Sequence, residues 1–172
     1  MPITEYQQEI TKHHNQPAQN PIDSIYETCA VPPYKPQKGS REATQALLAA
    51  SVQAPTTLHA EPWVFMVIQD AALLRELSDD VRESAEPQMR EYLHSLFREP
   101  DFNILYNAET LIVIYGKSMG ASTEADYWLT AENLILAASA MGYGTCVIGL
   151  AVQKLNTPEW KFRLGATFYP VI

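Results

Sequence analysis

The sequence predicts an α+β domain, in which helices and short strands alternate along the chain. Three or four apolar, β-rich runs lie between longer stretches in which apolar residues recur at helical spacing. The 172 residues are enough for one domain with a buried core, and 47% of them are hydrophobic against 19% charged. No internal repeat or low-complexity tract interrupts this pattern.

Prolines set the N-terminal part of the chain apart from the rest. Half of the 12 prolines fall before residue 37, and proline favours extended or turn conformations. We expect residues 1–21 to form a helical or loose arm and residues 22–172 to form the domain, with residues 30–39 as an extended connector. Such an arm either wraps a neighbouring molecule or frays as a free terminus.

The first half of the predicted domain begins with a helix. Ser40 is a suitable N-cap, apolar positions follow at helical spacing, and Ala54-Pro55 ends the helix. Residues 63–68 (W-V-F-M-V-I) then predict a buried strand. Asp70 caps a second helix, and a more polar helical pattern follows over residues 86–98.

The longest predicted helix lies in the second half. It follows a second buried strand over residues 111–115, starts at a cap supplied by Ser122 or Thr123, and runs to Met141. Gly142 is expected just after the helix end, where a left-handed residue is common. The apolar face of this helix is expected to comprise Ala125, Trp128, Leu129, Leu136, Ala137 and Ala140.

The C-terminal part is predicted to hold one short helix between two strands. Residues 145–149 (T-C-V-I-G) predict a third strand. Thr157 and Pro158 then occupy the N-cap and first positions of a helix that Gly165 stops. Residues 168–172 resemble the beginning of a fourth strand.

Charge and cysteine content exclude several classes of protein. A net charge of −8 without a basic patch argues against nucleic acid or a membrane as partner. No apolar run approaches the roughly 18 residues of a membrane helix, and the N-terminus lacks a signal-peptide stretch. Cys29 and Cys146 lie 117 positions apart, so we expect no disulfide scaffold and a cytoplasmic location. Cys146 is expected to be a buried, inert thiol. The histidines show no zinc-ligand spacing, so no metal site is expected.

Polar groups are concentrated between Ala54 and Trp63 (A-P-T-T-L-H-A-E-P-W). The prolines stiffen a turn that can fix side chains and backbone amides toward a ligand. His59 beside Glu61 is either a hydrogen-bonded loop histidine or a general base, and no Ser or Cys nucleophile can be placed beside it. Gly142-Tyr143-Gly144 follows a helix and opens a strand, the reverse of a dinucleotide-binding loop, so a helix cap and turn are expected.

The order of these segments resembles the nitroreductase-like flavoprotein family. Residues 54–63 resemble the family's A-P-S-x-x-N-x-Q-P-W block, in the A-P-T-x-x-H-x-E-P-W form of one subgroup. Tyr106-Asn107-Ala108 is similar to the aromatic-x-A-P sequence before the family's next strand. Residues 133–138 and 141–149 resemble its most diagnostic segment. These blocks follow in family order across residues 22–172.

The resemblance implies a homodimer with a mixed, mainly antiparallel sheet flanked by helices, and with the long helix over residues 123–141 at the dimer interface. It also implies FMN in the cleft between subunits, with NAD(P)H as reductant and a nitroaromatic, quinone or enone as acceptor in ping-pong turnover. No catalytic side chain is implied. The cofactor-binding residues that it implies are Pro55, Thr56, Thr57 and His59 along the flavin, and Ile148 and Gly149 near its N5 edge.

Two departures from the family pattern concern the FMN phosphate. The family's R-R-S-x-R block aligns with residues 28–32 (T-C-A-V-P), so both phosphate arginines are missing. Losing two charge-assisted hydrogen bonds of about 1.5–3 kcal/mol each would weaken FMN by roughly two to four orders of magnitude. Lys35, Lys38 and Arg41 are either substitutes or solvated charges. The short tail after Tyr169-Pro170 is expected to weaken the dimer and the phosphate grip.

Three functions stay open at this stage. The first is a flavin oxidoreductase, with FMN weakened or lost. The second is a flavin-free pseudoenzyme or small-ligand binding protein that keeps the dimer cleft. The third is a subunit that pairs with a complete paralogue. Trp128, Phe97 and Phe102 either line a substrate pocket or belong to the core.

Overall fold

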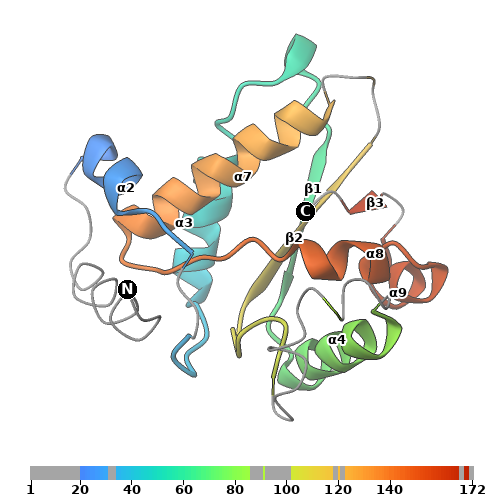
Figure 1. Ribbon diagram of the computed structural model, residues 1–172. Coiled ribbons are helices and arrows are strands. Elements are labelled where there is room, and N and C mark those ends of the chain that lie inside the picture. The colour runs from blue at the N-terminus through green and yellow to red at the C-terminus, as the bar shows by residue number, and fades with distance from the viewer. Residues whose placement is uncertain are drawn as a thin grey trace. The chain divides into compact units, whose positions relative to one another are not determined.

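The computed structural model describes residues 20–30, 34–85, 91, 102–117, 120, 123–166 and 169–170 (Figure 1). The chain divides into two compact units, which we describe one at a time. Unit 1 comprises residues 1–32, 40–61 and 119–147, and unit 2 comprises residues 33–39, 62–118 and 148–172. Residues 1–19 of the predicted arm lie outside the described residues, and so does the helix expected over 86–98 except for Glu91, which is helical.

Unit 2 contains a three-stranded antiparallel sheet in the order β1-β2-β3 (Figure 1). In β1 (Trp63–Ile68) and β2 (Leu111–Gly116), Trp63 lies opposite Gly116 and Ile68 opposite Leu111. β3 (Tyr169–Pro170) pairs with the end of β2. The strands predicted at residues 63–68 and 111–115 are confirmed, and the strand expected to begin at 168 is formed at residues 169–170. β1 is less buried than expected, because Val64 is 46% exposed.

The helices of unit 2 begin at the caps that the sequence predicts. The Asp70 carboxylate accepts hydrogen bonds from two backbone N–H groups in the first turn of α4 (Ala71–Ser84). The Thr157 side chain caps α9 (Pro158–Arg163) in the same way, and Gly165 follows α9 with a φ of 63°. These caps satisfy backbone donors that have no partner within the helix.

The core of unit 2 lies between α4, the sheet and the C-terminal helices. Here η2 (Gly149–Ala151) and α8 (Val152–Leu155) pack against α4. Trp160 is completely buried in this core. The other buried members are Ile68, Leu74, Leu77, Val81, Ile104, Leu105, Val113, Tyr115, Ala151 and Leu155.

Unit 1 is a helical unit centred on α7 (Thr123–Ala140). Both α2 (Pro21–Glu27) and α3 (Arg41–Ser51) pack against α7 (Figure 1). The Ser40 hydroxyl caps α3, as predicted. The side chain of Asn133 donates a hydrogen bond of 3.3 Å to the carbonyl of Ala50, which ties α7 to the end of α3.

The buried face of α7 differs from the face that the sequence predicts. Of the residues expected there, Trp128 and Leu129 are 46% and 45% exposed. The buried residues are instead Thr123, Asp126, Tyr127, Thr130, Ala131 and Ala138. The apolar face and the buried face differ because apolar residues occur on all sides of this helix, so their spacing does not single out the side that is buried. The helix ends as predicted, with Gly142 at φ 78° and the Tyr143 N–H bonded to the Ala138 carbonyl.

The strand expected over residues 145–149 is not formed. Among the described residues, this segment pairs only at Thr145, which forms an isolated parallel bridge with Ala30. Gly149 already belongs to η2. An apolar run extends as a strand only where a neighbouring segment continues the hydrogen bonding, and here one pair is formed.

Candidate cofactor site

The loop between α3 and β1 has an unusual backbone. Thr57–His59 form the short 3₁₀ turn η1. Leu58, His59 and Glu61 adopt positive φ angles of 55°, 54° and 42°. Residues other than glycine rarely adopt this conformation, and each such residue costs about 1–3 kcal/mol. Backbone strain of this kind is concentrated at functional sites, so the loop is the first candidate for one.

Hydrogen bonds within the loop hold this shape. The His59 N–H donates to the carbonyl of Thr56 at 3.2 Å, and the Ala60 N–H donates to the carbonyl of Thr57 at 3.1 Å. The Thr56 hydroxyl accepts from the backbone N–H of Glu61 at 3.4 Å. All three bonds join residues of the same loop and therefore stabilise the turn locally.

Asp126 ties this loop to α7. Its Oδ1 accepts from the backbone N–H of Thr57 at 3.1 Å and from the Thr57 hydroxyl at 3.3 Å. Asp126 is only 5% exposed. The pKa of the neighbouring Tyr127 is raised, first by burial of the Tyr127 side chain and second by the negative charge of Asp126. Sequence reasoning missed this residue, because acidic residues in a first helical turn are ordinarily explained by the helix dipole.

The structure brings together four of the six predicted cofactor-binding residues. Pro55, Thr57 and His59 are exposed and Thr56 is half-buried, all on the same loop of unit 1. Leu58, between them, is 93% exposed. The loop therefore presents its side chains to solvent.

The other two predicted residues belong to unit 2. Ile148 is half-buried and packs against the unit 2 core, while Gly149 is exposed and opens η2. A side chain built at Gly149 would meet nothing within 4 Å, so the space beside its backbone is open. Cys146, three residues before Gly149 and part of unit 1, is half-buried and not fully buried as expected, and burial raises the pKa of its thiol.

The described residues 28–30, where the family resemblance would place the first phosphate arginines, carry no charge. Thr28 caps the end of α2, and Ala30 pairs with Thr145. In the described part of unit 1, Arg41 is the one Lys or Arg side chain, and it is exposed. A phosphate held in unit 1 would therefore find little positive charge among the described residues.

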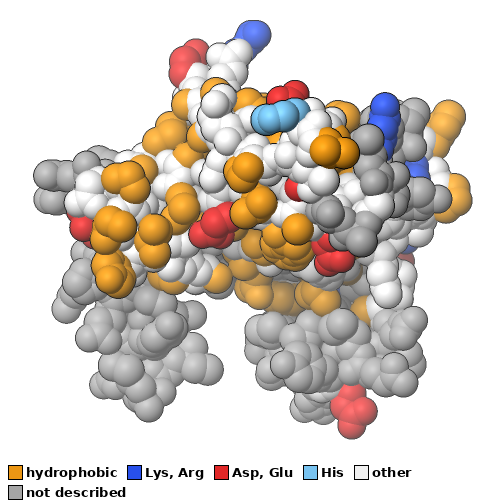
Figure 2. Space-filling model, turned by 90° about the horizontal axis from the view of Figure 1, so that it is seen from above, with side chains coloured by type: hydrophobic (Ala, Val, Ile, Leu, Met, Phe, Trp, Pro, Cys, Tyr) orange, Lys and Arg blue, Asp and Glu red, His pale blue; other side chains and the backbone are white. Residues whose placement is uncertain are grey.

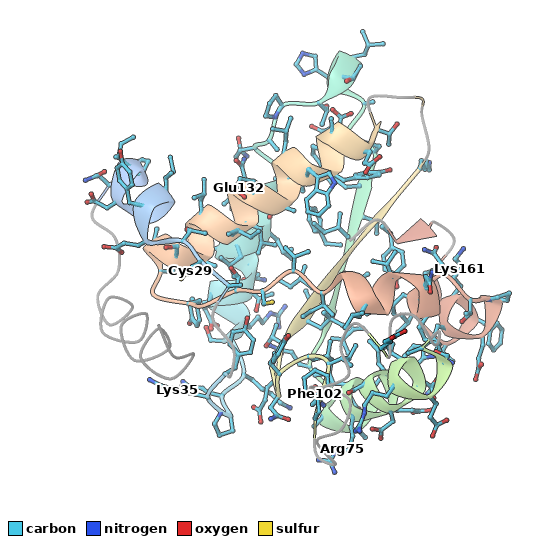
Figure 3. All side chains as sticks on the ribbon, in the orientation of Figure 1. Cys29, Lys35, Arg75, Phe102, Glu132 and Lys161 are labelled. Carbon is cyan, nitrogen blue, oxygen red and sulfur yellow. The ribbon has the colours of Figure 1, made fainter. Side chains whose placement is uncertain are left out.

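Apolar side chains are exposed on the helices of unit 1, and Figure 2 shows such side chains on the surface seen from above. On α2, Ile22, Ile25 and Tyr26 are 58%, 54% and 84% exposed. On α7, Trp128 and Leu129 are exposed near Glu132, which Figure 3 labels. Exposed apolar residues in such numbers are typical of a surface that binds another protein or a ligand.

Comparison with known proteins identifies the family. The nitroreductase family model matches residues 30–153, so the chain belongs to the nitroreductase family. A protein of Archaeoglobus fulgidus that carries the name of an NADH dehydrogenase/NAD(P)H nitroreductase is 24% identical over 149 residues, covering 84% of this chain and 75% of that protein. The family resemblance seen in the sequence is thereby confirmed.

Solved structures confirm the fold. A nitroreductase of Bacteroides fragilis with bound FMN has a TM-score of 0.78 at 21% identity, covering 89% of this chain and 83% of that chain. An FMN-dependent nitroreductase of Clostridium difficile has a TM-score of 0.70 at 28% identity, covering 81% and 64%. The predicted α+β, nitroreductase-like fold is therefore correct. No helix in the described ranges is both long and apolar enough to cross a membrane.

Proposed function

We propose that this chain is an FMN-dependent oxidoreductase that uses NAD(P)H to reduce a small aromatic or conjugated acceptor such as a nitroaromatic, quinone or enone. The observation that carries the proposal is the strained loop over residues 55–61, with the side chains of Pro55, Thr57 and His59 exposed, in a nitroreductase-family chain. The bound FMN of the Bacteroides fragilis relative and the NAD(P)H in the name of the Archaeoglobus relative support the choice of cofactors.

In this proposal the protein binds and orients, since the described loop offers no activated nucleophile. FMN supplies the hydride-transfer chemistry when bound. Pro55 and Thr56 would fix the course of the loop, Thr57 would present its hydroxyl, and His59 would offer an exposed imidazole for hydrogen bonding. The open backbone at Gly149 would admit close approach of a flat ligand.

The missing arginines predict weak binding of the phosphate. Because Arg41 is the one cation in the described part of unit 1, most of the affinity for FMN would come from the ring. The chain's net charge of −8 adds an unfavourable background for an anionic ligand.

A homodimer is part of the same proposal. The exposed side chains of Trp128 and Leu129 on α7, with those of Ile22, Ile25 and Tyr26 on α2, would be covered by a second copy of the chain. A cytoplasmic location stays a prediction from the sparse cysteine usage.

Titration of FMN into the purified protein, followed by quenching of flavin fluorescence at low and high salt, tests the proposal. We expect saturable binding that is weaker than is usual for a flavoprotein. Affinity should change little with salt, because Arg41 is the one cation in the described part of unit 1. A protein that is colourless and leaves flavin fluorescence unchanged would contradict the proposal.

That contrary result would favour the second candidate, a flavin-free pseudoenzyme or small-ligand binding protein. The observation on its side is the scarcity of cations in the described part of unit 1. An aromatic ligand without a phosphate would then bind in titrations where FMN does not.

A further inference from the structure

Asp126 is unusual among the described residues because it is a charged side chain in the interior. At 5% exposure it is the one Asp, Glu, Lys or Arg among the buried residues of the described ranges. Taking a carboxylate out of water is costly unless hydrogen-bond donors compensate. Thr57 supplies two of them to the same oxygen, Oδ1.

The position of Thr57 in the loop gives these bonds their importance. Thr57 directly precedes Leu58 and His59, two consecutive residues of this loop with left-handed backbone. Within unit 1, every other hydrogen bond made by the described loop residues 55–61 stays inside the loop. The two bonds to Asp126 are therefore the hydrogen bonds that fix the loop relative to α7.

The same bonds determine which hydrogen-bonding groups of Thr57 remain available to a ligand. Its backbone N–H is already donated to Asp126, and its hydroxyl proton is directed there as well. The remaining lone pairs of the hydroxyl oxygen can only accept a hydrogen bond. Thr57 would thus present an acceptor in a fixed orientation, with its side chain exposed to solvent.

We propose that Asp126 is a positioning residue for the cofactor loop: by holding both donors of Thr57, it keeps residues 55–61 in the strained shape that receives the ring of FMN. Asp126 acts through Thr57 and is not assigned a contact with FMN. The inference rests on the proposed function for its ligand, but its central contact is independent of any ligand.

The experiment compares four variants by two measurements. Asp126→Leu removes the acceptor and keeps a side chain branched at Cγ, whereas Asp126→Asn keeps an oxygen that can accept both bonds. Thr57→Val removes the hydroxyl bond alone. Glu124→Leu is the matched control, since Glu124 is an exposed acid in the same turn of α7. The measurements are amide hydrogen exchange of residues 54–61 without FMN, and the dissociation constant for FMN.

We expect faster exchange of the loop amides in Asp126→Leu, with wild-type rates in Asp126→Asn and Glu124→Leu. FMN binding should weaken by about tenfold or more in Asp126→Leu, because a hydrogen bond to a charged group corresponds to a factor of this order. Asp126→Asn should bind within about threefold of wild type, a difference of under 1 kcal/mol. Thr57→Val should fall between Asp126→Asn and Asp126→Leu.

Two results would overturn the inference. One is unchanged loop exchange in Asp126→Leu. The other is equal loss of FMN affinity in Asp126→Leu and Glu124→Leu. If Asp126→Leu does not fold, the comparison of Thr57→Val with Asp126→Asn decides the same question. Failure of the wild-type protein to bind FMN would count against the proposed function, and the exchange rates without FMN would still decide the role of Asp126.

Discussion

The indole N–H of Trp160 donates a hydrogen bond of 2.8 Å to Oδ2 of Asp80, 80 positions earlier in the chain. Trp160 is completely buried, and Lys154 lies 3.4 Å from the same carboxylate oxygen. This contact joins α9 to α4 within unit 2. It satisfies the one polar group of the indole while the ring fills the core.

Replacing Trp160 with Phe should therefore destabilise the protein by about 2–4 kcal/mol, through the lost hydrogen bond and the lost ring volume. Chemical denaturation followed by circular dichroism measures this free energy of unfolding. Asp80→Asn, which keeps an acceptor oxygen for the indole, should cost less than Trp160→Phe. The reverse order would show that the charge of Asp80, which Lys154 also contacts, matters more than the hydrogen bond and ring volume of Trp160.

The ion pair between Arg163 and Glu76 should contribute much less to the free energy of unfolding than the contact between Trp160 and Asp80. It is bidentate, and Arg163 also stacks over the Trp160 ring at 4.7 Å, but both charged groups lie at the surface. The hydrogen bond from Arg163 lowers the pKa of Glu76. The pair therefore stabilises the folded state above the ordinary carboxyl pKa, and this contribution is lost as the pH falls through the lowered value.

Glu76→Gln should accordingly reduce the unfolding free energy slightly at neutral pH, and not at a pH below the lowered pKa of Glu76. Unfolding curves at the two pH values provide the measurement. An equal effect at both pH values would mean that charge is not the cause.

Removing the hydroxyl of Tyr115 is expected to leave the protein as stable as before or to stabilise it. Tyr115 is 2% exposed in the unit 2 core, and its hydroxyl has no hydrogen-bond partner among the described residues. Tyr115→Phe should leave the unfolding free energy unchanged or raise it by up to about 2 kcal/mol, since a buried donor without a partner is costly. A loss of more than about 1 kcal/mol would indicate a partner for the hydroxyl.

The pH dependence of the same variant provides a second measurement. Burial raises the pKa of Tyr115 from 10.0 to about 12. The unfolded chain therefore releases this proton first, and the protein loses stability as the pH rises from 10 toward 12. Tyr115→Phe should lose less stability than wild type over that interval in pH-dependent unfolding.

Exposed residues of α7 provide a test of the proposed homodimer. A charge placed at Trp128, as in Trp128→Glu, should shift the protein from dimer to monomer in sedimentation experiments, because an unpaired charge would be buried in the interface. Phe162→Glu is the matched control, since Phe162 is 88% exposed on α9 in unit 2. A wild-type protein that sediments as a monomer would contradict the proposed assembly.

Local signals in the sequence were sufficient to predict most elements of this fold. Ser40, Asp70 and Thr157 cap their helices as expected, because a cap depends on a few adjacent residues. The strands at 63–68 and 111–115 were found for a similar reason, since each is a short apolar run bounded by turns.

Features that depend on distant partners were not predictable in this way. The burial of Asp126 follows from Thr57, which lies 69 positions away. The expected strand at 145–149 failed because pairing is limited to Thr145 and Ala30 in the described residues. For the candidate site, the loop over 55–61 was identified from its composition. Its left-handed residues were not, because leucine, histidine and glutamate ordinarily avoid that conformation.

The discontinuous course of unit 1 has a consequence for synthesis. α3 ends at Ser51, but α7, against which it packs, begins at Thr123, and the bridge between Ala30 and Thr145 spans a still longer interval. A nascent chain must therefore emerge from the ribosome beyond α7 before α3 can find its partner. Until then its inward face is open to chaperones or to aggregation, and closing such long loops slows folding.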